Sequence, residues 1–133
     1  MRQQRHVCRS TRPEETGWLA ALADPHIGPS IRAIHEEPGR SWTLEMLARQ
    51  VGVSRTVFAQ RFKRKVGATP IAYLTRWRMM LAGERLIETR DSIAEIAASL
   101  GYMSEYAFAA AFKREMGCPP RRYLRESSRV PRA

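Results

Sequence analysis

The stretch from residue 54 to residue 66 combines positive charge with the capacity to make hydrogen bonds. It holds five Lys or Arg side chains and no Asp or Glu. Within it, Gln60 can pair through two hydrogen bonds with an adenine edge, and Thr56 and Ala59 can contact a thymine methyl group. The cations can reach phosphates or guanine. This chemistry is the recognition of a nucleic acid, without bond making or breaking.

The net charge of the whole chain points in the same direction. The 133 residues include 23 Lys or Arg against 13 Asp or Glu, a formal net charge of +10. A polyanionic partner is therefore the first hypothesis to test. A basic composition alone also fits RNA-binding and membrane-surface proteins, and a single basic run can be no more than a solvated helix face. The positions of the charges along the chain must distinguish these classes of protein.

Length, composition and the rarer residues exclude several classes of protein. A chain with 44% apolar and 27% charged residues is typical of a globular protein, and 133 residues leave no room for a large two-domain enzyme. The sequence has no apolar run long enough to cross a membrane and no signal-peptide pattern at its start. Two cysteines and three histidines without zinc spacing predict neither a disulfide framework nor a metal site. We expect a cytoplasmic, nucleoid-associated protein with no cofactor.

Helical signals follow one another from Trp18 onward, and no segment has the pattern of a strand. Capping residues precede successive apolar periodic stretches, and Gly or Pro follows them. Ser92-x-x-Glu95 is a capping box. A short helix is expected over Trp18, Leu19 and Leu22. The helices expected after it run from Asp24-Pro25 to about Glu37, from Thr43 to Val51, from Ser54 to Val66, from Thr69-Pro70 to about Thr89, from Ser92 to Leu100, from Ser104 to Met116, and from Pro119-Pro120 onward.

Two stretches of the chain are copies of one unit. Before the turn, Thr43-Leu44-x-x-Leu47-Ala48-x-x-x-Gly52 matches Ser92-Ile93-x-x-Ile96-Ala97-x-x-x-Gly101 at an offset of 49. The second copy has one extra residue in its turn, so the offset becomes 50. The pairs that match after the turn include Ser54 with Ser104, Phe58 with Phe108, Phe62 with Phe112, Gly67 with Gly117, Pro70 with Pro120 and Tyr73 with Tyr123.

Each copy has the layout of a helix-turn-helix, with a short capped helix, a turn opened by glycine and a longer helix. Ala48 and Ala97 allow the two helices of each copy to approach closely. Helical hairpins without a DNA role share this spacing, but two copies in a chain of charge +10 favour DNA recognition. On a helical wheel Phe58, Phe62 and Val66 face inward, which turns the polar residues of the same helix outward.

The helix that opens at Pro70 is long enough to act as a strut. About 19 residues at 1.5 Å each span roughly 28 Å, near the ~34 Å repeat of one DNA turn. Such a strut can hold two reading helices against successive major grooves. The aromatic residues Trp42, Tyr73, Trp77 and Tyr123 have the spacing of core packing, and they are assigned no ligand role.

The motifs WTLEMLARQVGVSRTVFAQRFKRKVGATPIAYLTRWRM and IAEIAASLGYMSEYAFAAAFKREMGCPPRRYLR closely resemble the DNA-binding domain of the AraC/XylS family of bacterial transcription regulators. Together they cover most of residues 42–125. The preceding stretch GWLAALADPHIGPSIRAIHEEPGRSW is similar to the linker and first helix of members that carry an upstream cupin-like sensor domain. That sensor is not in this sequence, so we expect either a DNA-binding portion or a naturally short member.

The resemblance implies which residues enter the major groove. Carried over, these are Thr56, Ala59, Gln60 and Lys63, with Arg55 beside them, and in the second unit Glu105, Tyr106, Ala109, Ala110 and Lys113. The second set departs from the family pattern, in which a long polar or basic side chain often stands where this chain has alanine. Flanking cations and helix N-caps predict phosphate contacts at Thr43, Arg64, Ser92 and Arg114.

The sequence thus predicts an all-α, homeodomain-like fold of about seven helices. Its expected function is sequence-specific binding of double-stranded DNA and regulation, including activation, of bacterial transcription. RNA polymerase is a further expected partner, and no membrane or small molecule is expected to bind this chain. The alternatives are a non-specific nucleic-acid-binding protein and the DNA-binding part of a DNA-repair methyltransferase that would use Cys8 or Cys118.

The chain is expected to divide into five parts. These are a basic linker or disordered start (1–16), a first helix-turn-helix subdomain (17–67), a linker helix (68–90), a second helix-turn-helix subdomain (91–127) and a basic tail (128–133).

Overall fold

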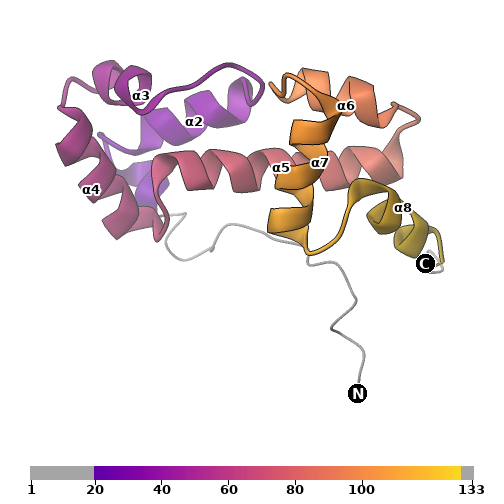
Figure 1. The fold of residues 1–133 in the computed structure, drawn as a ribbon. Helices are drawn as coiled ribbons and strands as arrows, with labels where there is room; N and C mark the ends of the chain where they lie inside the picture. Colours follow the sequence, from indigo (N-terminus) through magenta and orange to yellow (C-terminus); the bar gives the residue numbers. More distant parts are fainter. Residues whose placement is uncertain (1–19, 130–133) are drawn as a thin grey trace. The chain divides into compact units, whose positions relative to one another are not determined.

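The structure, a computed structural model, describes residues 20–129, with side chains up to residue 127. Every regular element in this range is a helix, which confirms the predicted all-α class (Figure 1). The expectations for residues 1–16, for Cys8 and for the last four residues lie outside the described part. Residues 20–23 are helical and are followed by α2 (Gly28–Glu36), α3 (Leu44–Gln50), α4 (Arg55–Val66), α5 (Pro70–Glu88), α6 (Ile93–Ser99), α7 (Glu105–Met116) and α8 (Pro120–Arg129).

Four hydroxyl side chains set the starts of the helices in the repeated unit, as the sequence predicts. The hydroxyls of Thr43, Ser54, Ser92 and Ser104 each accept a hydrogen bond from the backbone N–H three residues further on, at 3.0–3.2 Å. Each bond satisfies one of the N–H groups that a helix start leaves without an internal partner. At Ser92 the capping box is complete, because the Glu95 carboxylate accepts from the Ser92 N–H at 2.7 Å.

The predicted start of the helix that follows Asp24-Pro25 is wrong by about three residues. Asp24 does act as a cap, since its Oδ1 accepts from the N–H groups of His26 at 2.8 Å and Ile27 at 3.2 Å. The chain it caps is a turn over residues 25–27, and α2 begins only at Gly28 with Pro29 in its first turn. An Asp-Pro pair serves a turn as well as a helix start, and the local sequence does not separate the two.

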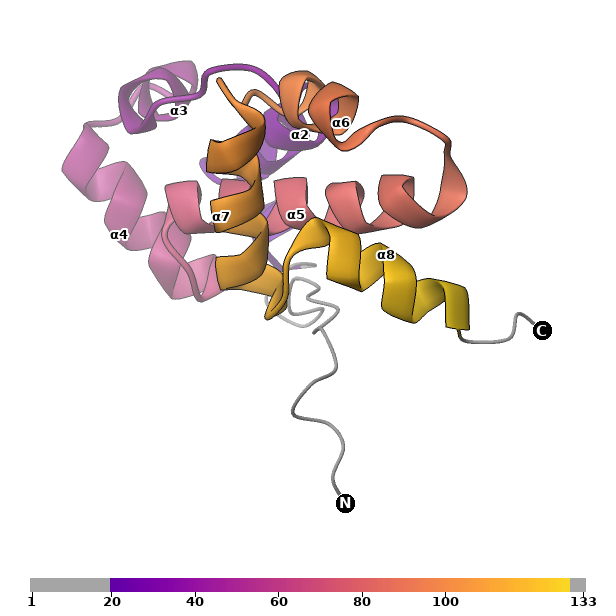
Figure 2. The ribbon, with the colours of Figure 1, turned by 45° about the vertical axis from the view of Figure 1, so that its right-hand side comes forward.

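Four glycines occupy the same places in the two copies and share one backbone conformation. Gly52 and Gly101 lie in the turns, and Gly67 and Gly117 end the longer helices, all with φ between 73° and 91°. Residues with a Cβ rarely adopt this left-handed conformation. The glycines therefore fix the length of each helix and the direction of the chain after it, so each short helix leads to a longer helix at an angle (Figure 2).

The described chain divides into two compact units, and the division falls inside α5, between Trp77 and Arg78. The first unit contains α2, α3, α4 and the beginning of α5. The second contains the rest of α5 with α6, α7 and α8. Each unit has its own hydrophobic core.

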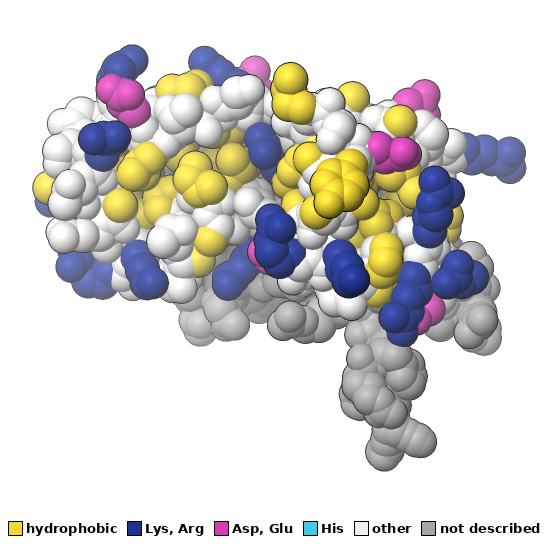
Figure 3. All heavy atoms as spheres, viewed as in Figure 1, with side chains coloured by type: hydrophobic (Ala, Val, Ile, Leu, Met, Phe, Trp, Pro, Cys, Tyr) yellow, Lys and Arg dark blue, Asp and Glu magenta, His cyan; other side chains and the backbone are white. Residues whose placement is uncertain are grey.

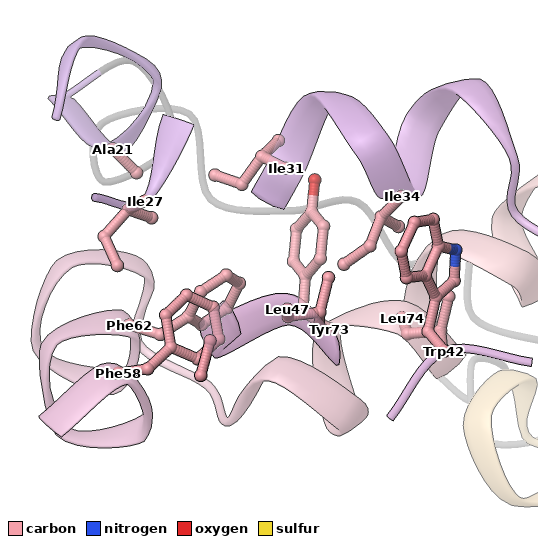
Figure 4. Packing of buried hydrophobic residues seen from close by; sticks show 11 residues of the cluster. Ala21, Ile27, Ile31, Ile34, Trp42, Leu47, Phe58, Phe62, Tyr73 and Leu74 are labelled. Atoms are coloured by element: carbon pink, nitrogen blue, oxygen red, sulfur yellow. The ribbon is translucent and has the colours of Figure 1, made fainter. Parts of the chain in front are cut away.

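The core of the first unit is built around aromatic side chains from α4 and α5. Phe58 and Phe62 are fully buried, with ring centroids 5.7 Å apart, and Tyr73 meets Phe62 edge-on at 5.8 Å. Ile31 and Ile34 of α2 belong to the same cluster and are also fully buried. Figure 4 shows these side chains pointing toward one another from α2, α4 and α5.

A polar contact joins α2 to α5 at the border of this core. The His35 ring stacks on Trp77 with centroids 3.7 Å apart, and its Nε2 lies 2.5 Å from the Tyr73 hydroxyl. Burial disfavours the charged imidazolium and so lowers the pKa of His35. Trp42, Tyr73 and Trp77 all pack against the first core, in agreement with the prediction that they are packing residues.

The second unit repeats the same aromatic arrangement. Phe108 and Phe112 are fully buried with centroids 5.8 Å apart, and Tyr123 of α8 meets Phe112 edge-on at 5.3 Å. Gly83 of α5 lies against the Tyr123 ring, where a Cβ would come within 3.0 Å of the hydroxyl oxygen. The tyrosine is therefore held between Phe112 and the α5 backbone.

We predict that Phe62→Ala lowers the free energy of unfolding of the first unit by about 3–5 kcal/mol, because it leaves a cavity among rings that pack on each other. Urea unfolding followed by circular dichroism measures this change. Thr56→Ala, on the exposed side of the same helix, is the matched control and should change stability by less than about 0.5 kcal/mol. Equal unfolding midpoints for the two variants would contradict the packing described.

Candidate nucleic-acid interface

The first helix-turn-helix is formed by α3 and α4. The Val53 N–H donates to the Ala48 carbonyl at 3.2 Å and so closes the turn between them. Ala48 is buried against this turn, and a larger side chain there would push the two helices apart. With Phe58 and Phe62 packed inward, the opposite side of α4 faces solvent.

The outward side of α4 carries most of the residues that the sequence singles out. Thr56, Gln60 and Lys63 are exposed, and Arg55 and Arg64 are exposed beside them. Ala59 differs from the others, because it is only half-buried rather than open. The structure thus brings five of the six predicted α4 residues onto an open surface, which we call the α4 face (Arg55, Thr56, Gln60, Lys63 and Arg64).

The basic run of α4 separates into two groups in the structure. Arg61 turns back toward the loop before α2, where its Nη1 lies 2.8 Å from His26 Nδ1. Lys65 forms an ion pair with Asp24 at 3.8 Å. These two cations therefore tie α4 to the rest of the first unit and leave the remaining three for a partner. Sequence spacing alone could not separate them, because His26 and Asp24 are more than thirty residues away.

The second helix-turn-helix, α6 and α7, presents a different surface. Glu105, Tyr106 and Ala110 are exposed, as are Lys113 and Arg114 nearer the end of the helix. We call this surface the α7 face. Ala109 is half-buried, like its counterpart Ala59 in the first unit. Figure 3 shows hydrophobic side chains gathered over α7 with Lys and Arg side chains around them.

Five cations of these two faces are available to a partner. Within the part of the chain that the structure describes, ion pairs engage other Lys and Arg side chains, but none engages Arg55, Lys63, Arg64, Lys113 or Arg114. A polyanion that binds these cations releases the counterions that accompany them in solution.

The two predicted N-cap contacts differ in their surroundings. Thr43 and Ser92 are both exposed, and each uses its hydroxyl to cap its own helix. The Glu95 carboxylate lies against the Ser92 N–H, so a negative charge already occupies the start of α6. The start of α3 also carries an acidic residue in its first turn, Glu45, but within the described residues the structure shows no carboxylate bond to its N-cap N–H.

Sequence reasoning missed one exposed residue next to α7. Met103 is 97% exposed, the largest exposed fraction among the large apolar side chains of the described residues. It lies in the turn before Ser104. The sequence signal that could have pointed to Met103 is the one extra residue in the turn of the second copy.

Two other classes of site have no support in the described residues. Between residues 20 and 129, no helix is long and apolar enough to span a membrane. The same residues contain no group of three His, Cys, Asp or Glu side chains placed to hold a metal ion.

Comparison with known proteins identifies the family. Residues 47–126 match a family model described as a helix-turn-helix domain. A putative AraC-like transcription regulator of Streptomyces lividans is 49% identical over 108 residues, which are 81% of this chain and 36% of that protein. The transcriptional activator RclR of Escherichia coli is 40% identical over 109 residues, 82% of this chain and 38% of RclR.

The fold has a solved counterpart. The DNA-binding domain of AdpA, a global transcriptional factor whose crystal structure contains a target DNA, has a TM-score of 0.76 and 27% identity, covering 84% of this chain and all of that one. The chain belongs to the AraC-type helix-turn-helix family of transcription regulators. It spans little more than a third of the length of the curated relatives above.

We predict a steep dependence of DNA affinity on salt, because the cations of the two faces can each displace counterions from phosphates. If about 6 phosphates are neutralised, log K should fall against log salt with a slope near −5. Fluorescence anisotropy of a labelled duplex between low and moderate salt gives this slope. A slope shallower than about −2 would mean that these cations serve solubility and do not contact DNA.

Proposed function

We propose that this chain binds double-stranded DNA at a specific sequence, with α4 and α7 in successive major grooves, and that it thereby regulates bacterial transcription. The observation that carries the proposal is the outward side of each long helix. In both units an aromatic pair holds one side of the helix in the core, and the opposite side presents exposed side chains with exposed cations. That arrangement suits a helix that lies in a groove lined by phosphates.

Base reading by the first unit is assigned to Gln60, Thr56 and Arg55. An exposed glutamine can pair with adenine N6 and N7, and arginine can pair with guanine O6 and N7. Lys63 and Arg64, farther along the same side, take phosphate or guanine contacts. Ala59, being half-buried, contributes at most its methyl group.

In the second unit, Glu105 can accept from a cytosine amino group and Tyr106 can cover a thymine methyl group. Lys113 and Arg114 contact phosphates. Ala109 and Ala110 offer no hydrogen bond through their side chains, so this unit reads fewer base features than the first. Thr43 and Ser92 add phosphate contacts at the starts of α3 and α6.

The placement in two successive grooves is supported by the length of α5. Its 19 residues rise roughly 28 Å in an unbroken helix, which is close to the ~34 Å repeat of one DNA turn. The chain carries two unlike reading helices, so one copy can occupy both grooves without a partner subunit.

We propose RNA polymerase as the second partner, through which the DNA-bound chain affects transcription. The two proteins would meet in the cytoplasm, at the nucleoid. Duplex DNA held by one side of each unit leaves other sides open for a protein contact. RclR, one of the relatives, is a transcriptional activator, and activation is the mode that we propose for this chain.

Non-specific nucleic-acid binding is the rival reading, and competition distinguishes it. A specific complex should survive an excess of random-sequence duplex that displaces a non-specific one.

The repair-methyltransferase alternative needs a reactive thiol. Cys118 is 1% exposed and is not a free thiol, and the family consists of transcription regulators.

We predict that one chain protects roughly two turns of duplex, about 20 base pairs, at an asymmetric site, because the two reading helices differ in sequence. Selection of bound fragments from a random duplex library, followed by footprinting, provides the site and its length. Protection of a single turn, or a palindromic site that requires two chains, would contradict the arrangement.

We further predict that base preference is sharper under the first unit. Gln60→Ala should cost about 1–3 kcal/mol and relax preference at one or two adjacent positions. Lys113→Ala should weaken all sequences alike, since a phosphate contact carries no sequence information. The affinities of both variants for a panel of duplexes with single-base changes test this prediction. Equally strong base preference in the two halves of the site would contradict it.

A further inference from the structure

The extra residue of the second turn can be located from backbone hydrogen bonds. In the first unit the Val53 N–H donates to the Ala48 carbonyl at 3.2 Å, and in the second the Tyr102 N–H donates to the Ala97 carbonyl at 3.0 Å. These pairs are 49 residues apart, so Tyr102 is the counterpart of Val53. Both side chains pack against the core of their unit. The two copies are therefore still in register at Tyr102.

The register changes directly afterwards. Ser54 and Ser104 cap α4 and α7 by the same bond to a backbone N–H three residues on, and they are 50 residues apart. The residue between Tyr102 and Ser104 is Met103, which has no counterpart in the first unit. Because Tyr102 keeps the core contact, Met103 is left outside, and it is 97% exposed.

Met103 does not stand alone on this surface. Tyr106, the second residue of α7, is 84% exposed, and the small side chains Ala107 and Ala110 are exposed on the same helix. We call these four residues the apolar tip. Single exposed apolar residues are ordinary, but a methionine and a tyrosine in near-complete contact with water beside two alanines form a patch that favours a partner.

The charges around the apolar tip indicate a polyanionic partner. Lys113 and Arg114 are exposed farther along α7, and the Arg78 guanidinium lies 5.5 Å from the Tyr102 ring centre, beside the turn. Glu105, exposed at the first position of α7, would be repelled by a phosphate. The tip itself must then face a part of the partner that carries no phosphate.

The major groove of DNA has one apolar feature on its base edges, the C5-methyl group of thymine. Resting on the DNA binding proposed above, we infer that the second unit selects thymine through this methyl group, which is covered by Met103 and Tyr106 with the alanines of the apolar tip. A methionine side chain is flexible and adapts to the position of a methyl group. The second unit thus adds apolar contact to the hydrogen bond assigned to Glu105, whereas the first unit relies more on hydrogen bonds.

The test replaces thymine by deoxyuridine, which removes only the methyl group and keeps every hydrogen bond of the base pair. The duplex carries the selected site, and the half under the second unit is the one whose preferences Gln60→Ala leaves unchanged. Deoxyuridine in that half should weaken binding by about four-fold for each methyl contacted, which corresponds to ~0.8 kcal/mol per buried group of this size. Fluorescence anisotropy measures the ratio of the two affinities.

Variants connect the effect to the residues. Met103→Ala and Tyr106→Ala should each bring the thymine-to-deoxyuridine ratio closer to one, with circular dichroism as the check on folding. Ile71→Ala removes an exposed apolar side chain of the first unit and should keep the ratio of the unchanged protein. A ratio of one for the unchanged protein, or a ratio that neither tip variant alters, would overturn the inference.

The two levels of the proposal fail in different ways. If the site is sharply selected but deoxyuridine has no effect, methyl reading is wrong and sequence-specific DNA binding stands. If random duplex competes as well as the selected one, the proposed function is wrong and methyl reading falls with it.

Discussion

The orientation of each reading helix about its own axis depends on one kind of contact, the edge-to-face packing of a tyrosine with the second of two buried phenylalanine rings. Phe62 meets Tyr73 at 5.8 Å in the first unit, and Phe112 meets Tyr123 at 5.3 Å in the second. Rings in edge-to-face contact gain both buried area and favourable electrostatics. Since the phenylalanines are one turn apart on their helix, burying both leaves a single side of α4 or α7 free to face solvent. The caps and glycines set where these helices begin and end, but the aromatic cluster decides which residues a partner meets.

The same frame carries two different surfaces. Position for position, Thr56 corresponds to Tyr106 and Gln60 to Ala110, so a small hydroxyl side chain is replaced by a large aromatic one and an amide by a methyl group. The interior pairs stay alike because packing tolerates little change in volume. The outward positions have no such constraint from the fold. The units therefore differ where a partner would distinguish them and agree where stability requires it.

The sequence was sufficient for features that depend on near neighbours and insufficient for those that depend on distant ones. The hydroxyl caps at Thr43 and Ser54 and the glycine at residue 67 act within a few residues, and each was predicted correctly. The start of α2 was wrong because Asp24 can cap either a turn or a helix. The inward turn of Arg61 and Lys65 depends on a loop more than thirty residues away, and the exposure of Met103 follows from which residue of the turn keeps the core contact. The contacts assigned to DNA remain predictions.

The separation of the buried side from the open side of α4 affects how new DNA specificities can evolve. A substitution at Gln60 or Thr56 exchanges one solvent-exposed side chain for another, and such changes usually alter stability by less than about 0.5 kcal/mol. A gene copy can thus accumulate changes on this side while its product still folds at full abundance. New operators can then be acquired one base pair at a time, and related regulators in one genome can come to control separate sets of genes without passing through an unfolded intermediate.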